Sequence, residues 1–324
     1  MEYSNVSSHE WEKIILKSDN AHFFHSPTWA KIMEKTYNLS AATRLYHING
    51  KEILIPMMEQ HEYGLKTFAS MPGNTDQGGL FSESDITTDD FKSIANDIVG
   101  GRNVSLHIAL SPFMKLSLDG SSPIKDEWKV KDEWNYVHML KLEGRDFEQI
   151  WKNYNGKTRN SIRKAIKSGV ETRDATSLDD FKTFYEIFSG ASQRWGFETP
   201  EVPFKLLKNL YKCAFDNIKL SLAIKDEKII AGLLSFPFSN TFYLFVGSFL
   251  PEYGTLNPSR LLYNNLIEQA CQEGYKYFSF GPTGNLKHIK KVKEGFGAEK
   301  VEINRYRVYS NLGKILNKIN QLRK

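Results

Sequence analysis

The sequence predicts an α/β protein with two domains in tandem, and three observations support this prediction. The chain has 324 residues, which is about twice the usual length of a single domain. Strand-like segments alternate with amphipathic helix-like segments in both halves, as is typical of α/β proteins. Residues 43–56 and 220–233 both read as a strand, a tight polar turn with lysine and a second strand. Such an internal similarity is expected if the two halves share one fold.

The composition is typical of a soluble protein with large packed cores. Hydrophobic residues make up 40% of the chain and charged residues 25%, which is ordinary for globular domains. No stretch approaches the ~20 apolar residues that a membrane-spanning helix needs, and the polar start of the chain does not resemble a secretory signal. The two cysteines, Cys213 and Cys271, fit neither a metal site nor a disulfide framework. We therefore expect a reducing, cytoplasmic setting.

The motifs of several catalytic classes are missing from the sequence. It contains no GxxxxGK[ST], no GxGxxG after a strand, no HExxH and no GxSxG. The eight histidines are scattered, so we expect no metal site and no permanently bound cofactor. The net charge of +5 suits an anionic ligand such as a nucleotide or phosphate, but it does not indicate a stable complex with nucleic acid.

The first domain is assigned to residues 1–145. Ser8 and Ser26 are typical helix N-caps, and Asn49-Gly50 predicts a tight turn between two strands. The expected elements are helices from Ser8 and Ser26, strands at 42–47 and 52–58, a loop at 70–81, a helix at 88–98, and strands at 104–110 and 136–142.

The second domain is assigned to residues 146–310 and carries the expected donor site. Its strand–loop–helix–strand order over 241–281 brings a helix N-terminus to the edge of a sheet, which favours binding of pyrophosphate or another anion. Asn257, Ser259 and Arg260 lie at that N-terminus, either as donor-binding residues or as an ordinary helix cap. One or two helices are expected over 147–168, and single helices over 178–195, 203–215, 259–273 and 286–294. The expected strands are 218–224, 228–238, 241–250, 277–281 and 300–309.

Four segments, in order along the chain, resemble the Fem-like branch of the GNAT superfamily. They are FHSPTWAK (24–31), KTRNSIRKAIKSGV (157–170), RWGF (194–197), and the set PSRLL (258–262), GYKYFSFG (274–281) and VKEGFG (292–297). This branch includes the peptidoglycan-bridge aminoacyltransferases and CelD-type acetyltransferase-like proteins. The resemblance implies two tandem GNAT-like domains with mixed sheets flanked by helices.

The resemblance also implies a reaction in which an amine attacks an ester or thioester carbonyl. The co-substrate would be acyl-CoA or an aminoacyl-tRNA, held where strands 241–250 and 277–281 splay apart. Lys293 matches a family lysine and would stabilise the oxyanion or hold a phosphate; otherwise it is a solvated lysine. Tyr243 and Tyr253 would relay a proton or protonate the leaving group, or else they simply pack.

The acceptor is expected to be a small-molecule or lipid-linked amine bound at the junction of the domains. Residues 151–170 contain six basic side chains and no acidic one. Arg159 and Arg163 share a helix face and would clamp a diphosphate or a tRNA backbone, unless the helix is merely solvated. The matching segments add five candidate acceptor-binding residues: Trp29, Lys31, Arg194, Trp195 and Phe197.

The segment 311–324 predicts a C-terminal amphipathic helix. Its apolar positions are Leu312, Ile315, Leu316, Ile319 and Leu322, with lysine and arginine opposite them. This stripe either packs back on the first domain or makes a peripheral contact with a membrane surface.

Two departures from the family keep three functions open. The GNAT pyrophosphate motif is not intact, since only Gly254 lies in a comparable loop, and the sequence has no heptad repeat for the helical arm of bridge-forming enzymes. The preferred hypothesis is an N-acyltransferase that moves an acyl group from a thioester to an amine of a cell-envelope or polysaccharide precursor. The alternatives are a tRNA-dependent peptidoglycan-bridge transferase and a non-catalytic binding protein.

Overall fold

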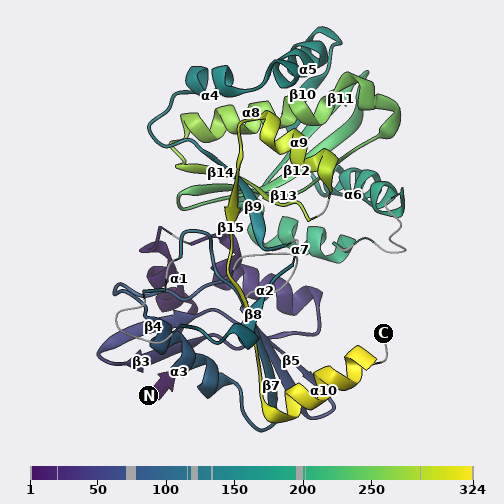
Figure 1. The fold of residues 1–324 in the computed structure, drawn as a ribbon. Coiled ribbons are helices and arrows are strands. Elements are labelled where there is room, and N and C mark those ends of the chain that lie inside the picture. The colour runs from purple at the N-terminus through teal and green to yellow at the C-terminus, as the bar shows by residue number, and fades with distance from the viewer. Residues whose placement is uncertain are drawn as a thin grey trace. The chain divides into compact units, whose positions relative to one another are not determined.

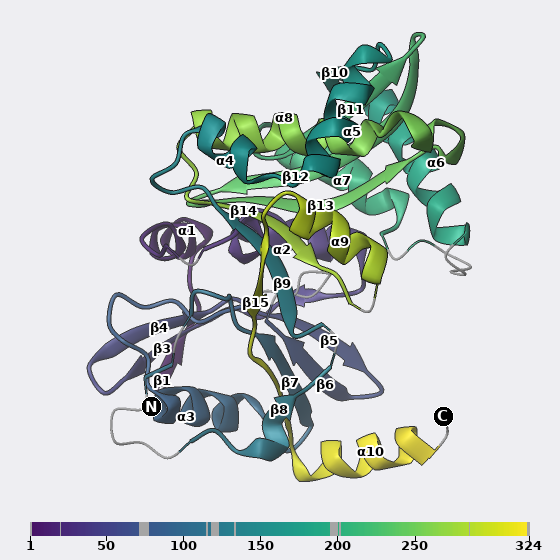
Figure 2. The same cartoon turned by 45° about the horizontal axis from the view of Figure 1, so that its top comes forward.

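The computed structural model divides the chain into two units (Figures 1 and 2). Unit 1 comprises Met1–Asn135 and Glu302–Lys324, and unit 2 comprises Tyr136–Val301. The structure describes residues 2–19, 21–70, 78–114, 116–117, 123–132, 134–194, 200, 202–284 and 286–322. None of the helices in these ranges is long and apolar enough to cross a membrane.

Strand pairing explains why these units differ from the boundaries expected at 145/146 and 310/311. Strand β9 (Tyr136–Lys141) pairs with β14 (Tyr277–Pro282) and so belongs to unit 2. Strand β16 (Arg305–Tyr309) pairs with β7 (Asn103–Ala109) and so belongs to unit 1. The chain therefore returns to its first unit before the last strand, and hydrogen-bonded partners rather than sequence order decide the division.

Unit 1 contains two sheets, in the orders β1-β3-β4 and β2-β5-β6-β7-β16-β8. The strand expected at 52–58 is interrupted at Pro56, which has no backbone N–H to donate. The remaining strands are β1 (Glu2–Ser4), β2 (Ser40–Ala41), β3 (Arg44–Ile48), β4 (Lys51–Ile55), β5 (Met58–Glu62), β6 (Leu65–Ala69) and β8 (Lys129–Val130). The helices are α1 (Ser8–Leu16), α2 (Pro27–Thr36), α3 (Thr88–Ile98) and α10 (Asn311–Leu322).

Unit 2 is built on a seven-stranded sheet in the order β10-β11-β12-β13-β14-β9-β15. Strands β13 and β14 run parallel, whereas β10–β11, β11–β12, β12–β13 and β14–β9 are antiparallel. The remaining strands are β10 (Glu171–Asp174), β11 (Lys219–Lys225), β12 (Lys228–Phe238), β13 (Thr241–Phe249) and β15 (Glu299–Glu302). The helices are α4 (Phe147–Asn153), α5 (Gly156–Lys167), α6 (Leu178–Arg194), α7 (Phe204–Ala214), α8 (Pro258–Gln272) and α9 (Lys287–Gly295).

Helices cover both faces of this sheet. Ala231 and Leu233 of β12 belong to the same buried cluster as the apolar face of α8. Gly232 points the other way, since successive side chains of a strand alternate between faces, and a Cβ there would lie 2.5 Å from the Phe184 ring of α6. Glycine is therefore required for α6 to pack this closely.

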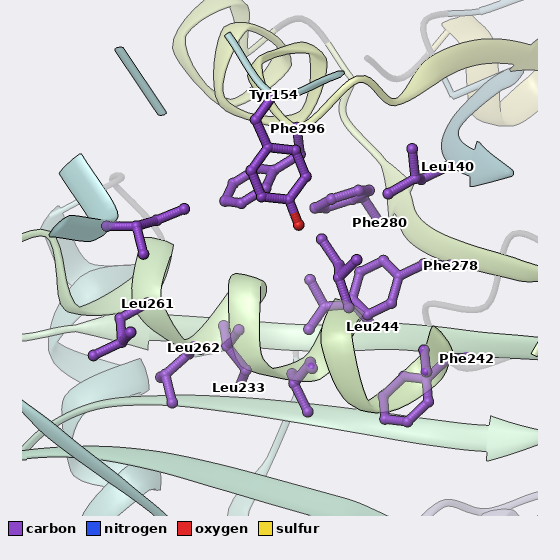
Figure 3. Close-up of a cluster of buried hydrophobic side chains, with 14 of the residues drawn as sticks. Leu140, Tyr154, Leu233, Phe242, Leu244, Leu261, Leu262, Phe278, Phe280 and Phe296 are labelled. Atoms are coloured by element: carbon purple, nitrogen blue, oxygen red, sulfur yellow. The ribbon is translucent and has the colours of Figure 1, made fainter. Parts of the chain in front are cut away.

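Aromatic rings fill the core on the α8 side (Figure 3). Phe242 and Phe278, from the two parallel strands, stack with centroids 5.7 Å apart. Tyr154, at the end of α4, packs edge-on against Phe296 at 4.9 Å. Its hydroxyl points into the cluster and has no hydrogen-bond partner within the described ranges. Burial raises the pKa of Tyr154, so this side chain is a neutral packing group.

The two units repeat one pattern of strand directions. In unit 1, β6 leads through α3 to the parallel strand β7, and β7 pairs antiparallel with β16. In unit 2, β13 leads through α8 to the parallel strand β14, and β14 pairs antiparallel with β9. The predicted α/β architecture of two related mixed sheets flanked by helices is confirmed.

Candidate functional site

The candidate site lies where the parallel strands β13 and β14 stop pairing. Their register covers only three positions, from Thr241 opposite Tyr277 to Tyr243 opposite Ser279. Beyond this point β13 continues to Phe249 and β14 continues to Pro282. Each remains paired with its outer neighbour, β12 or β9. The edges of β13 and β14 that face each other are therefore no longer paired beyond this point, in the middle of the sheet.

A β-bulge in β13 marks the same place. Ser235 of β12 faces Leu244, but the preceding Leu234 faces Val246, so Phe245 is an extra residue. A bulge disrupts the ladder locally and turns backbone groups out of it. The bulge therefore lies close to the point where the register between β13 and β14 ends.

Gly281 lets the end of β14 approach β13 closely. Its φ is +66°, a left-handed conformation that glycine adopts without strain. A Cβ on Gly281 would lie 3.2 Å from the Tyr243 hydroxyl oxygen and 3.4 Å from the Leu244 carbonyl oxygen. Tyr243 is itself 2% exposed, so its hydroxyl is held inside the protein against this glycine.

Lys293 fastens α9 to the same end of β14. Its ammonium donates to the Gly281 carbonyl at 3.0 Å and to the Pro282 carbonyl at 2.6 Å. The side chain is 4% exposed, and a buried charge requires such hydrogen bonds. In this structure Lys293 therefore holds the backbone turn rather than projecting into solvent.

A histidine and a threonine complete the polar cluster. The Thr283 hydroxyl and His138 Nδ1, from β9, lie 2.8 Å apart. Burial, together with the positive charge of Lys293, lowers the pKa of His138 to about 4. The ring is therefore neutral near pH 7. Its Nε2 is buried and has no hydrogen-bond partner among the residues that the structure describes.

The N-terminus of α8 is the second part of the site. Residues Pro251–Leu256 between β13 and α8 form a 3-10 helix. Asn257 follows with φ +58°, and its side chain does not cap α8. Ser259 is partly exposed. Arg260 is half-buried and donates to the Thr158 hydroxyl of α5 at 3.3 Å, and burial lowers the pKa of its guanidinium.

The family comparison agrees with this geometry. Residues 153–290 match the family model described as "Acetyltransferase (GNAT) domain". This match covers the divergent strands, α8 and Thr283, whereas His138 and Lys293 lie outside it. This part of the chain is therefore similar to GNAT acetyltransferase domains. The enzyme class that follows is an acyltransferase. A search of curated proteins found no match.

Solved structures share the fold along nearly the whole chain. FemX aligns with a TM-score of 0.72 at 12% identity, covering 98% of this chain and 99% of that one. L-PGS from Bacillus licheniformis aligns with a TM-score of 0.53 at 11% identity, covering 94% of this chain and 92% of that one. A tandem GNAT protein from the clavulanic acid biosynthesis pathway aligns with a TM-score of 0.52 at 9% identity, covering 95% of this chain and 98% of that one. The fold of this chain is thus that of tandem GNAT proteins, including a Fem protein.

The basic helix α5 makes more contacts within the protein than its sequence suggests. Arg159 donates to the Lys152 carbonyl at 2.9 Å and also to the Tyr154 carbonyl, so it holds the end of α4. Arg163 is exposed, and its guanidinium lies 5.7 Å from the centre of the Trp151 ring. The structure therefore gives these two arginines different surroundings, although they share a helix face.

The other predicted residues are scattered. Tyr253 lies in the 3-10 helix before α8 and packs against the core, with the Lys228 ammonium 5.3 Å from its ring centre. Trp29 is fully buried in unit 1 against Phe24, whereas Lys31 is exposed on the same helix. Trp195, Phe197 and the side chain of Arg194 lie outside the described residues.

Sequence reasoning missed three members of the site. Two of them had a sequence signal that could have identified them. His138 is a single histidine inside an apolar strand, and Thr283 lies two residues after the GYKYFSFG motif. No sequence signal marks the bulge at Phe245, because a bulge arises from the mismatch between two strands.

Proposed function

We propose that this protein is an N-acyltransferase that carries an acyl group from a thioester to an amine of a cell-envelope or polysaccharide precursor. The observation that carries this proposal is the opening of the parallel β13–β14 pair beside a β-bulge, within a GNAT domain. The envelope class of the acceptor rests on the resemblance of the sequence to the Fem-like branch.

In this proposal the acyl carbonyl lies between the diverging strands. The amine nitrogen attacks the carbonyl carbon, and the oxyanion that forms accepts hydrogen bonds from backbone N–H groups near Phe245. The carbon–sulfur bond then breaks and the thiolate leaves. His138 is the candidate base, since its neutral ring has a buried Nε2 with no hydrogen-bond partner in the described part of the chain. Lys293 is a positioning residue, because its hydrogen bonds fix the turn at Gly281.

The N-terminus of α8 fits an anionic part of the donor only in part. Asn257 leaves the helix without a side-chain cap and Ser259 is partly exposed, which leaves room for a phosphate at the positive end of the helix dipole. Arg260, however, is turned toward Thr158. We infer that a CoA-type donor is held by backbone groups at this helix and not by a glycine-rich loop.

Ligand-dependent melting and acyl transfer test this assignment together. A ligand that binds only the folded state raises the melting temperature by mass action. We expect acetyl-CoA to raise it, and labelled acetyl groups to appear on an amino-sugar acceptor. Ser259→Glu should abolish the shift, because it places a negative charge at the helix N-terminus. Gln272→Glu adds the same charge at an exposed position of the opposite end of α8 and serves as the matched control.

An aminoacyl-tRNA donor is the second candidate. It is favoured by the 3-10 helix that occupies residues 251–256, where a CoA pyrophosphate loop would lie, and by the exposed basic face of α5 around Arg163. Binding of tRNA should weaken steeply as salt is raised. A melting shift with tRNA and none with CoA compounds would overturn the thioester proposal in favour of this one.

A further inference from the structure

Helix α10 packs on unit 1 with its small and polar side and not with its apolar side. It lies against β7 and β16. Gly313 is buried there, and a Cβ at this position would lie 2.0 Å from the Val104 carbonyl oxygen. The Asn317 amide oxygen accepts from the Tyr309 hydroxyl at 3.3 Å. These contacts fix the rotation of the helix about its axis.

This orientation turns an apolar stripe outward. Leu312 is 39% exposed, Ile315 57% and Ile319 41%. Their spacing places them on one side of an α-helix. Of the apolar positions in the described part of this helix, only Leu316 lies at the packed side, where it is half-buried. The stripe is thus a surface feature and contributes little to the core of unit 1.

Charge and an aromatic side chain flank the stripe. Residues 311–324 carry four basic residues and no acidic one, and Lys314 and Lys318 are exposed along one flank. On the other flank, a 350 Å³ groove is lined jointly by Leu316 and by Tyr63. Tyr63 is 99% exposed at the tip of the β5–β6 hairpin. Figures 1 and 2 both draw this hairpin close to α10.

We propose that this surface, formed by Leu312, Ile315, Ile319, Lys314, Lys318 and Tyr63, docks on an anionic lipid bilayer. Apolar side chains enter the headgroup region, lysines meet lipid phosphates, and tyrosine is favoured at the interface. The proposal does not depend on the catalytic one, since no residue of the candidate active site takes part.

The features of the surface favour lipid over a second copy of the chain. A symmetric dimer would bring Lys314 and Lys318 toward their own copies, which is unfavourable without acidic partners. A helix of 12 residues is also only about 18 Å long, short for the roughly 800 Å² per partner of a standard interface. One short stripe suits weak, reversible membrane binding that needs both apolar and charged contacts.

Vesicle co-sedimentation of the full chain tests the proposal. We expect binding to vesicles of equal parts phosphatidylglycerol and phosphatidylcholine, and little binding to phosphatidylcholine alone. Lys314→Gln with Lys318→Gln should weaken binding about 25-fold at low salt. Leu312→Gln, Ile315→Gln and Ile319→Gln together should weaken it roughly 100-fold.

The matched control is Ile166→Gln, which removes an apolar side chain 59% exposed on the basic helix α5 and should bind like the parent. All variants should keep the parent melting temperature, because the changed side chains are exposed. The proposal is overturned if the parent chain ignores anionic vesicles or if the triple variant binds as well as the parent. It is also overturned if the triple variant instead converts a dimer to a monomer in sedimentation.

Discussion

Two features of the backbone at Gly281 favour glycine over other amino acids. It adopts a left-handed backbone, and a Cβ at this position would lie 3.2 Å from the Tyr243 hydroxyl oxygen, which is closer than an ordinary contact. Its carbonyl also accepts a hydrogen bond from Lys293. The residue therefore determines both the path of β14 and the position of the buried ammonium.

Replacing Gly281 with alanine should destabilise unit 2 and impair transfer. The left-handed conformation costs about 1–3 kcal/mol for a residue with a side chain, and the Tyr243 hydroxyl must also move. We expect a lower denaturation midpoint and a reduced kcat with little change in donor affinity. Gly274→Ala is the control, because Gly274 has φ +79° with nothing within 4 Å of its Cβ position. Equal losses in both variants would mean that the contact with Tyr243 is unimportant.

His138 should make the protein sensitive to acid. Its pKa is about 4 in the folded protein against 6.5 ordinarily, so between these values the unfolded chain binds the proton and the folded chain does not. The free energy of unfolding should therefore fall as the pH drops from about 6.5 toward 4. His138→Gln should flatten this part of the curve.

A second histidine provides the comparison for this measurement. Burial and the neighbouring Arg307 and Arg305 lower the pKa of His107 in unit 1 to about 4 as well. Chemical denaturation across this pH range, followed for the parent, His138→Gln and His107→Gln, separates the two contributions. An unchanged pH dependence in His138→Gln would contradict the assignment of a depressed pKa to this ring.

At the scale of single elements, helix α5 carries two arginines with different surroundings. The guanidinium of Arg159 meets the last carbonyls of α4, which otherwise have no intrahelical partner. That of Arg163 lies at the surface over Trp151. The helix therefore has one arginine that joins it to its neighbour and one that is exposed.

The two arginines should respond differently to mutation. Arg159→Met should lower the free energy of unfolding by about 1–3 kcal/mol, the cost of hydrogen bonds to a charged donor, without a specific effect on KM. Arg163→Met should leave stability within about 0.5 kcal/mol and raise KM for a phosphorylated acceptor. Urea unfolding and steady-state kinetics of both variants check this. Loss of stability in Arg163→Met would contradict the distinction.

At the scale of the whole molecule, unit 1 is assembled from two distant stretches of chain. Strand β16, which lies between β7 and β8, comes from the last stretch. Unit 2, by contrast, is continuous from Tyr136 to Val301. Removing the end of the chain should therefore damage only one unit.

A chain truncated after Val301 loses β16 and α10. We expect unit 1 to lose its cooperative unfolding transition and to become sensitive to protease, because β7 and β8 lose the strand that joins them. A fragment of about residues 136–301 should remain resistant. Limited proteolysis with mass spectrometry identifies it. Protection of residues 1–135 in the truncated chain would contradict this dependence on β16.

Much of the fold was accessible from the sequence. The Asn49-Gly50 turn, the cap at Ser26, and the alternation of strands with amphipathic helices are local signals, and the structure contains these elements. The cap predicted at Ser8 is instead Ser7, one residue earlier. The family resemblance predicted the tandem GNAT-like architecture and brought Lys293, Gly281 and the α8 N-terminus to attention. These features depend on short spacings, which a sequence displays directly.

The tertiary structure alone decided how those residues are used. Lys293 faces two carbonyls, Arg159 faces the end of α4, and the apolar stripe of α10 faces outward. The stripe of α10 faces outward because of a distant neighbour, Val104 of β7, whereas the contacts of Lys293 and Arg159 join elements close together in the sequence. A sequence states which side chains a helix carries and at what spacing, but the direction in which the helix turns them is set by how the elements pack against one another.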